Sequence, residues 1–481
     1  MKNLLILICL FMIPAALFAW EKTYGGVLID RGYSIRQLQD GNIVISGYTS
    51  TYGAGGGDVY LLKIDTNGNK LLEKTFGGGS YDLGASIQIL PNNSGFVIGG
   101  TTSSFGNGAE DFLLLKTDNS FNTVFQKAFG GRSGEWCNSV SLVNDGGFIL
   151  AGETISFGAG GRDIYVVRTD AQGNIIWAKT FGRTNDEYGR WAIQTDEGGF
   201  IIAGSTNSYG NGKHDCLLIK TDENGNIQWE NVYGGFEHDV AISIHSLSDG
   251  YIICGEASNL GAGEGEMYLF KINKQGTLIF EKVFGGNSVD WGREAIQTND
   301  GGFIACGATY SYGSGNQDMF IVKTDSNGNL QWQSVAGGEN DDVAYSVIQT
   351  EDQHYAFIGY TESYGSGYAD VYLYKTEKET GFSAQKIIPK KESASIATYP
   401  NPFRSNVNIN YSIKEDGQIK LQIFDISGKL MKTLVDEKKQ KGNYSLIWQA
   451  NTDKKINGGV FFIKLSSNDR ILATRKILQI E

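Results

Sequence analysis

DCLLIKTD, residues 215–222, is one of seven closely similar segments that recur along this chain. The others are DVYLLKID from Asp58, DFLLLKTD from Asp111, DIYVVRTD from Asp163, EMYLFKIN from Glu266, DMFIVKTD from Asp318 and DVYLYKTE from Asp370. Successive copies start 53, 52, 52, 51, 52 and 52 residues apart. A regular repeat of about 50 residues indicates the architecture before any local feature is considered.

Each repeat contains four short strand-like runs. In the fourth copy these are RWAIQT, GFIIAGST, DCLLIKTD and NIQWENVYGG, which are separated by the turn signals DEGG, SYGNGKH and ENGN. No repeat shows the apolar spacing of three and four that a helix requires. Four antiparallel strands per unit, repeated seven times, predict an all-β chain built as a seven-bladed β-propeller.

The last repeat stops after DVYLYKTE, whereas the others continue into a fourth strand such as IIWAKTFGG. The missing strand resembles WEKTYGG, Trp20–Gly26, at the other end of the repeat region. We therefore expect residues 20–377 to form a propeller that its N-terminal strand closes.

The first nineteen residues combine Lys2, an apolar run from Leu4 to Phe18 and a small residue at position 19, which is typical of a secretory signal peptide. No later stretch reaches the roughly 20 apolar residues that cross a bilayer, so we expect no transmembrane segment in the mature chain. Removing Lys2 takes the net charge from −12 to −13. Such an acidic chain is a poor partner for nucleic acid.

The repeats resemble secreted bacterial propeller repeats related to the quinoprotein dehydrogenase superfamily. The motif DxxGxxxW carries the likeness at residues 170–177, 222–229 and 325–332. The likeness covers about 360 residues and implies a blade, but no chemistry. Kelch propellers fit less well, because the glycine pair here precedes the second strand.

After the last repeat, residues 378–396 are rich in Lys, Ser and Glu and read as an exposed linker. Residues 397–481 then alternate in short strands, which predicts a small β-sandwich. YPNPF, IFDISGK, the GxYxLxW of residues 442–448, GGVFFIKL and RKI resemble the C-terminal sorting domain of the type IX secretion system. The related immunoglobulin-like domain of the flagellar hook-capping protein is also similar. The resemblance implies export through the secretion machinery, and a secreted or outer cell surface location.

An acid stands four or five residues before the small residue, Ser or Ala, that opens each expected first strand. These acids are Asp30, Asp82, Glu135, Glu187, Asp239, Asp290 and Asp342. We expect them to surround one mouth of the central channel. They either accept N–H groups of their own turns, as such acids often do, or form a cation site, for which calcium is the candidate.

Departures from the repeat are more informative about binding, because the blade does not require them. We expect eight such residues on the same rim: Trp136, Tyr188, Arg190, Trp191, Trp291, Arg293, Glu294 and His238. The first six are the candidate ligand-binding residues. Aromatic rings beside arginines are typical of surfaces that bind a sugar or a peptide. The alternative is that these rings are partly buried and serve packing.

Enzyme signatures are mostly missing. The four histidines lack ligand spacing, and no nucleophile elbow or HExxH motif occurs. We therefore expect no catalytic residue and no cofactor, and favour a non-catalytic binding or scaffold protein whose ligand is a glycan or a protein. The alternative is a glycan-active hydrolase or lyase that uses the acidic rim.

Overall fold

The computed structural model describes residues 20–376, apart from 259, 262 and 263, and residues 396–479 with gaps at 402, 414–415, 426–428, 450–458 and 468–469. The expected signal peptide and the expected linker lie outside the described residues, except that Ile396 begins a strand. The chain divides into two compact units, residues 1–388 and 389–481. Among the described residues there is no helix long and apolar enough to span a membrane.

The first unit consists of four-stranded antiparallel sheets that repeat along the chain. Sheet 1 contains β2 (Asp30–Gln37), β3 (Ile43–Thr49), β4 (Asp58–Ile64) and β5 (Lys70–Phe76). Sheet 2 contains β6 (Asp82–Ile89), β7 (Phe96–Thr102), β8 (Asp111–Thr117) and β9 (Thr123–Phe129), with a short 3-10 helix, η1 (Pro91–Asn93), after β6. Sheet 3 contains β10 (Glu135–Leu142), β11 (Phe148–Thr154), β12 (Asp163–Thr169) and β13 (Ile175–Phe181).

The later sheets follow the same order. Sheet 4 contains β14 (Glu187–Gln194), β15 (Phe200–Thr206), β16 (Asp215–Thr221) and β17 (Ile227–Tyr233). Sheet 5 contains β18 (Asp239–Leu247), β19 (Gly250–Ala257), β20 (Glu266–Asn273) and β21 (Leu278–Phe284). Sheet 6 contains β22 (Asp290–Gln297), β23 (Phe303–Thr309), β24 (Asp318–Thr324) and β25 (Leu330–Ala336). Sheet 7 contains β26 (Asp342–Gln349), β27 (Tyr355–Thr361), β28 (Asp370–Lys375) and, from the start of the chain, β1 (Trp20–Tyr24).

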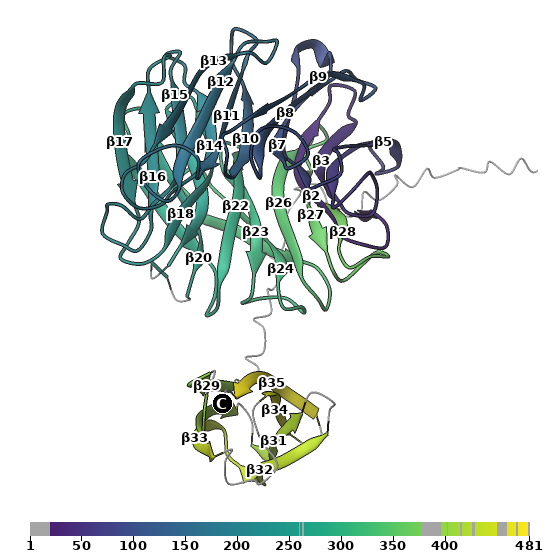
Figure 1. Cartoon of the computed structure of the whole chain (residues 1–481), viewed down its shortest axis with the longest axis vertical. Coiled ribbons are helices and arrows are strands. Elements are labelled where there is room, and N and C mark those ends of the chain that lie inside the picture. The colour runs from purple at the N-terminus through teal and green to yellow at the C-terminus, as the bar shows by residue number, and fades with distance from the viewer. Residues whose placement is uncertain are drawn as a thin grey trace, which may run out of the picture. The chain divides into compact units, whose positions relative to one another are not determined.

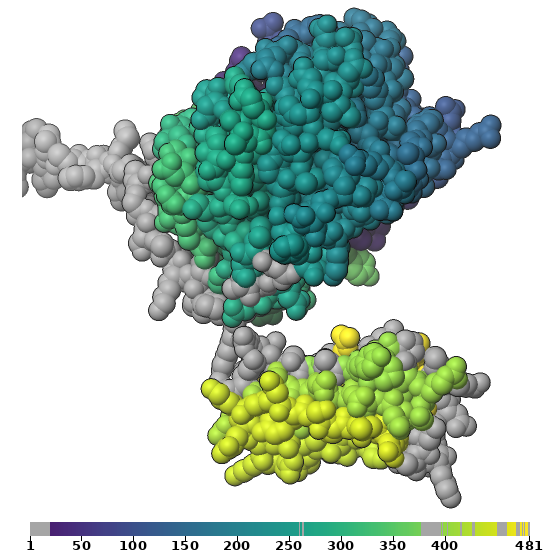
Figure 2. Space-filling view, turned by 90° about the vertical axis from the view of Figure 1, so that its left-hand side faces the viewer, coloured from purple at the N-terminus to yellow at the C-terminus, as the bar shows by residue number. Residues whose placement is uncertain are grey.

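The first strand of each sheet lies at the centre of the unit. β2 contacts both β6 and β26, and the contacts continue through β10, β14, β18 and β22, so the first strands form a closed ring (Figure 1). On the face seen in Figure 2, successive sheets abut, and their colours pass gradually from green to blue. Neighbouring sheets bury a core between them. For example, Ile201 and Leu218 of sheet 4 pack in one cluster with Ile253 and Phe270 of sheet 5.

β1 supplies the fourth strand that the last repeat lacks. It pairs antiparallel with β28, from Trp20 opposite Lys375 to Tyr24 opposite Val371. The Tyr24 hydroxyl also donates to the carbonyl of Gly68, 2.7 Å away in sheet 1. At Gly25 the chain passes between two carboxylates, because a Cβ there would lie 2.4 Å from Asp370 Oδ1 and 2.6 Å from Asp30 Oδ2.

Every first strand has the same irregularity near its middle. The pairing with the second strand shifts between the third and fifth residues, for example between Gly189 and Trp191 in β14 and between Gly292 and Glu294 in β22. A bulge of this kind leaves one residue unpaired and changes the alternation of side chains along the strand. The two halves of a first strand therefore present their side chains at opposite ends of the ring.

The second unit has two sheets around one core. β29 (Ile396–Tyr399), β30 (Asn406–Ile413) and β33 (Gly442–Gln449) form one sheet, and β32 (Leu430–Lys439), β31 (Gly417–Asp425), β34 (Gly459–Ser467) and β35 (Arg470–Gln479) form the other. Trp448 is the largest fully buried side chain and packs between Phe403 and Phe461, whose ring centroids lie 5.6 and 5.8 Å away.

Candidate functional site

The seven acids expected to surround a channel mouth are the first residues of the first strands, and all are fully buried. Each carboxylate accepts the backbone N–H of the residue four positions earlier. The donors are Gly26 for Asp30 (2.8 Å), Gly78 for Asp82 (2.9 Å), Gly131 for Glu135 (2.6 Å), Arg183 for Glu187 (2.6 Å), Gly235 for Asp239 (2.7 Å), Gly286 for Asp290 (2.7 Å) and Gly338 for Asp342 (2.7 Å). Each acid is thus held by its own turn.

Hydroxyl groups from the second strands or the loops after them complete this arrangement in most sheets. Thr154 and Thr206, for example, donate to Glu135 (2.7 Å) and Glu187 (2.6 Å). Burial raises the pKa of Asp239 to about 6, although the N–H groups of Gly235 and Ser258 oppose the rise. Across the described ranges no three acid, histidine or cysteine side chains cluster as metal ligands would. The acids do not line an open mouth, because the turns enclose them.

Six of the eight expected rim residues, all except Trp191 and Glu294, lie at the end of the ring where these acids begin the strands, which we call the acid end. Arg162 stacks over Trp136, with its guanidinium carbon 4.5 Å from the ring centroid, and bonds Glu153 at 2.9 Å. The Arg190 guanidinium lies 5.7 Å from the Tyr188 ring. In sheet 6, Arg293 lies 5.5 Å from the ring of Trp291.

Glu294 does not lie with them, and neither does Trp191. It follows Arg190 directly, but the bulge in β14 separates the two, and Trp191 lies at the other end of the ring. There it contacts His245 of sheet 5, with ring centroids 5.4 Å apart. The expected single rim is therefore two groups of residues at opposite ends of the ring.

Trp191 lines a cavity of about 630 Å³ in the centre of the ring. All of its lining residues come from the second halves of the first strands or from the turns that follow, and none comes from the acid end. We call it the central cavity. Its polar and aromatic lining includes Arg36, Gln88, Trp191, His245 and Glu294.

Glu294 is the best-defined polar group of the central cavity. It is the fifth residue of β22, a position that is serine in five of the other six sheets. Two of those serines link adjacent sheets by accepting a backbone N–H. Ser346 Oγ accepts the N–H of Ile35 at 3.4 Å, and Ser139 Oγ accepts the N–H of Ala192 at 3.3 Å. Glu294 Oε2 keeps this link by accepting the N–H of Val347 at 3.1 Å. Its second oxygen is thereby available for another purpose.

That second oxygen bonds His245. Glu294 Oε1 lies 3.0 Å from His245 Nε2, and Glu294 is only 1% exposed. Burial alone would raise the pKa of Glu294, but the hydrogen bond from His245 and the charges of Arg36 and His245 lower it to about 2. Glu294 is therefore ionised at neutral pH. A carboxylate in this position fixes the orientation of the imidazole and directs its other nitrogen away from the bond.

Arg36 reaches the central cavity from the far side of the ring. Its Nη1 donates to the carbonyl of Ile35 at 2.7 Å, and its Nε donates to Gln88 Oε1 at 3.4 Å. The cavity thus combines an aromatic ring, a guanidinium, an imidazole, an amide and a carboxylate, all in side chains from different sheets. Planar donors and acceptors beside an indole ring can bind a ligand that has both hydroxyl groups and an apolar face.

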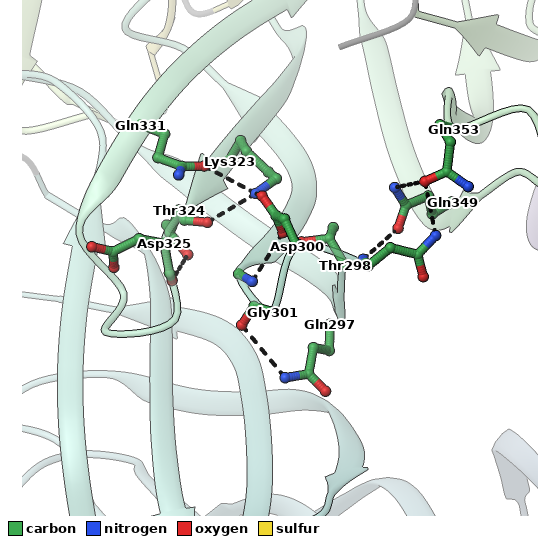
Figure 3. A network of polar contacts seen from close by, with 12 residues as sticks. Gln297, Thr298, Asp300, Gly301, Lys323, Thr324, Asp325, Gln331, Gln349 and Gln353 are labelled. Carbon is green, nitrogen blue, oxygen red and sulfur yellow. Dashed lines mark hydrogen bonds and ion pairs between the residues drawn. The ribbon is translucent and has the colours of Figure 1, made fainter. Parts of the chain in front are cut away.

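The edge of the central cavity is held by bonds between sheets. Gln349 Oε1 accepts the N–H of Asn299 at 2.8 Å (Figure 3), and Gln194 and Gln37 make the same bond to Asn144 (2.8 Å) and Glu351 (2.9 Å). The turns that carry these donors are themselves anchored.

Figure 3 also includes one such anchor, the ion pair of the buried Lys323 with the exposed Asp300. Lys323 Nζ lies 2.7 Å from Asp300 Oδ2 and 3.0 Å from both the Thr324 carbonyl and Gln331 Oε1. Related pairs join Lys220 to Glu197 and Lys375 to Asp352. The cavity edge is therefore rigidly positioned.

Sequence reasoning missed Arg36, Gln88 and His245. His245 and Glu294 are 49 residues apart and belong to different repeats, so no local motif joins them. Glu294 and Trp191 are visible in the sequence as the two departures from serine at the fifth position of the first strands. The prediction that they share a rim with the residues of the acid end is wrong, because both line the central cavity.

The comparisons with known proteins identify the C-terminal part of the chain. Residues 397–481 match the family described as the secretion system C-terminal sorting domain. The chain carries a sorting domain of the type IX secretion system. This sorting domain indicates export to the cell surface or the extracellular space.

Residues 38–70 match a β-propeller family described as a domain of unknown function (DUF5122), and no curated protein matches the chain. Together with the repeated sheets, this match shows a propeller-like all-β unit that precedes the sorting domain in the sequence.

Solved structures of other proteins are similar at low identity. Puromycin hydrolase has 11% identity and a TM-score of 0.46, with 79% of this chain and 58% of that chain covered. The phage phi92 endosialidase has 10% identity and a TM-score of 0.43, with coverages of 96% and 87%. The β-propeller domain of the Trilobed protease from Pyrococcus furiosus has 8% identity and a TM-score of 0.39, with coverages of 75% and 96%. The chain spans about 58% of the length of the puromycin hydrolase chain.

Proposed function

We propose that this protein is an exported, non-catalytic binding protein that holds a glycan in its central cavity. The single observation that carries the proposal is the cavity of about 630 Å³ in which Glu294 fixes His245 beside Trp191. Export to the cell surface or beyond, which the sorting domain indicates, brings this cavity to polysaccharides outside the cell.

The proposal includes a definite architecture. Residues 20–377 form a seven-bladed β-propeller closed by β1, residues 378–396 are a linker, and residues 397–481 are an immunoglobulin-like β-sandwich. The seven repeated sheets, the closed ring of first strands and the pairing of β1 with β28 support it. Two sheets around Trp448 support the sandwich.

The lining of the cavity favours a saccharide over other small ligands. A sugar presents hydroxyl groups that both donate and accept, and its C–H face packs against an aromatic ring. Arg36 donates, His245 presents the ring nitrogen that Glu294 does not bond, and Gln88 both donates and accepts, while Trp191 supplies the ring. Pockets of several hundred Å³ with a few converging polar groups are the usual size and form of small-ligand sites.

The test is binding of a panel of neutral oligosaccharides to the full chain, measured by calorimetry. Trp191→Ala should weaken binding at least tenfold, because it removes the stacking face. Trp177→Ala is the matched control, since Trp177 lies on an outermost strand, β13, and lines no part of the cavity. Equal affinities in all three proteins would refute the site.

The second candidate function, a glycan-active enzyme, predicts that products appear when the same oligosaccharides are incubated with the full chain. The acids of the first strands do not favour it, because all seven are fully buried and each is bonded by its own turn. If the wild type turns over an oligosaccharide and Glu294→Gln abolishes that turnover, the protein is an enzyme and the binding proposal is wrong.

A further inference from the structure

Two arginines at the acid end have no role in the repeat. Arg190 and Arg293 are the fourth residues of β14 and β22. The other five sheets carry Tyr33, Ala85, Asn138, Ile242 and Tyr345 at this position. Because small, apolar and aromatic residues all fit there, the sheet itself does not require a guanidinium.

Neither arginine is neutralised by a carboxylate at close range. In the part of the chain that the structure describes, Arg190 and Arg293 form no ion pair within 4.0 Å and no hydrogen bond. Their neighbours are rings instead: Arg293 lies 5.5 Å from Trp291 and 5.3 Å from Tyr345. Arg162, at the same end of the ring, differs in that it bonds Glu153 at 2.9 Å.

Polar atoms beside these arginines also lack partners. Arg293 Nε and Trp291 Nε1 are both buried and bond nothing within the described residues, and the same is true of Glu153 Oε2. Buried donors without acceptors are unfavourable, and native proteins rarely leave them so. Two donors side by side in sheet 6 therefore point to an acceptor that a ligand supplies.

Charge supports the same conclusion. Burial lowers the pKa of Arg190; the carboxylate of Glu153 opposes this fall, and the charge of Arg293 adds to it. Two guanidinium groups that weaken each other in a partly buried place are relieved when an anion binds between them. Arginine is suited to this, because its planar group donates two parallel hydrogen bonds to one carboxylate.

We propose that the acid end of the ring is a second binding site, separate from the central cavity, in which Arg190 and Arg293 bind the carboxylate of an acidic saccharide. Tyr188 lies beside Arg190 and Trp291 beside Arg293, and Trp136 stacks on Arg162 at the same end of the ring. These rings offer flat faces to sugar rings. A uronic acid unit has both features, a carboxylate and a sugar ring.

The experiment compares matched ligands on the full chain. Oligomers of galacturonate, glucuronate and mannuronate are titrated by calorimetry, each beside its methyl ester, which has the same ring but no charge. At least one acid form should bind ten times more tightly than its ester, and its affinity should fall as salt is raised.

Two variants locate the site. Arg190→Gln combined with Arg293→Gln should remove the difference between acid and ester, and the exposed Arg132→Gln is the matched control that should keep it. Trp191→Ala, in the central cavity, should also keep the difference in affinity between acid and ester. A failure of the proposed function and a failure of this inference therefore give different results. A wild-type chain that binds no acid better than its ester, or a double variant that still does, overturns the proposal.

Discussion

Glu294 offers the sharpest test of how the central cavity is built, because the repeat itself supplies the control substitution. Serine is the usual residue at this position, so Glu294→Ser should keep the link to the Val347 N–H and lose only the bond to His245. Glu294→Ala should lose both. We expect Glu294→Ala to be less stable than Glu294→Ser by about 1 kcal/mol, the usual value of one buried hydrogen bond.

The pH dependence of stability gives a second and larger estimate of how much free energy Glu294 contributes to folding. The pKa of Glu294 falls from 4.5 to about 2 on folding. At about 1.4 kcal/mol for each pKa unit, the ionised carboxylate stabilises the folded chain by about 3 kcal/mol relative to its protonated form. Because the folded pKa lies below the unfolded one, this stabilisation is complete above pH 4.5 and is lost as the pH falls toward 2. About 2 kcal/mol should be gone by pH 3.

The assay is guanidinium unfolding of the full chain at pH 7, 5, 4 and 3, followed by circular dichroism. The difference in unfolding free energy between the wild type and Glu294→Ser should shrink by about 2 kcal/mol from pH 7 to pH 3. Parallel curves would refute the reasoning, because they would mean that Glu294 titrates alike in the folded and unfolded chains.

Four further outcomes follow from the fold. Deleting residues 20–26 should lower the free energy of unfolding by about 3 kcal/mol or more, since Trp20 and Tyr24 lose their packing and β28 its partner; a deleted chain with unchanged melting would contradict closure by β1. A chain truncated at Lys390 should still fold its repeated sheets but stay out of the medium and off the surface of its host, as immunoblots of cell fractions would reveal. EDTA should leave the melting temperature unchanged, because each buried acid is bonded by its own turn. Trp448→Ala should destabilise the second unit by about 3 to 5 kcal/mol, seen in calorimetry as a shift of one transition while the other stays in place.

The repeat predicted the strands well because its signals are local. DVYLLKID begins at Asp58, as β4 does, and the turn signals between runs fall between the strands of each sheet. The likeness of residues 397–481 to a sorting domain is confirmed by the family match over the same residues. Both predictions depend on short-range patterns that one sequence displays in full.

The candidate site could be predicted only in part, because the bulges in the first strands change the direction of the side chains, and the sequence does not show where the bulges lie. Arg190 and Trp191 are adjacent in the sequence, and counting alone places them on one rim. The pairing shifts between Gly189 and Trp191, and the two side chains have different neighbours: Arg190 lies beside Tyr188, whereas Trp191 lies beside His245 in the central cavity. The partnership of His245 with Glu294 needs the spacing between neighbouring sheets, which periodicity does not contain.

The pairing of β1 with β28 also sets an order of events during folding. Tyr372 bonds Glu21 across 351 residues of sequence, so the first strand to be synthesised finds its partner only after nearly the whole repeat region exists. Closing so long a loop is entropically unfavourable, and contacts between distant segments form late. Until then β28 has an unpaired edge, along which another chain could add. A newly made molecule is therefore most prone to aggregate just before its last sheet is completed, and a chaperone that shields β28 during that interval would raise the yield of folded protein.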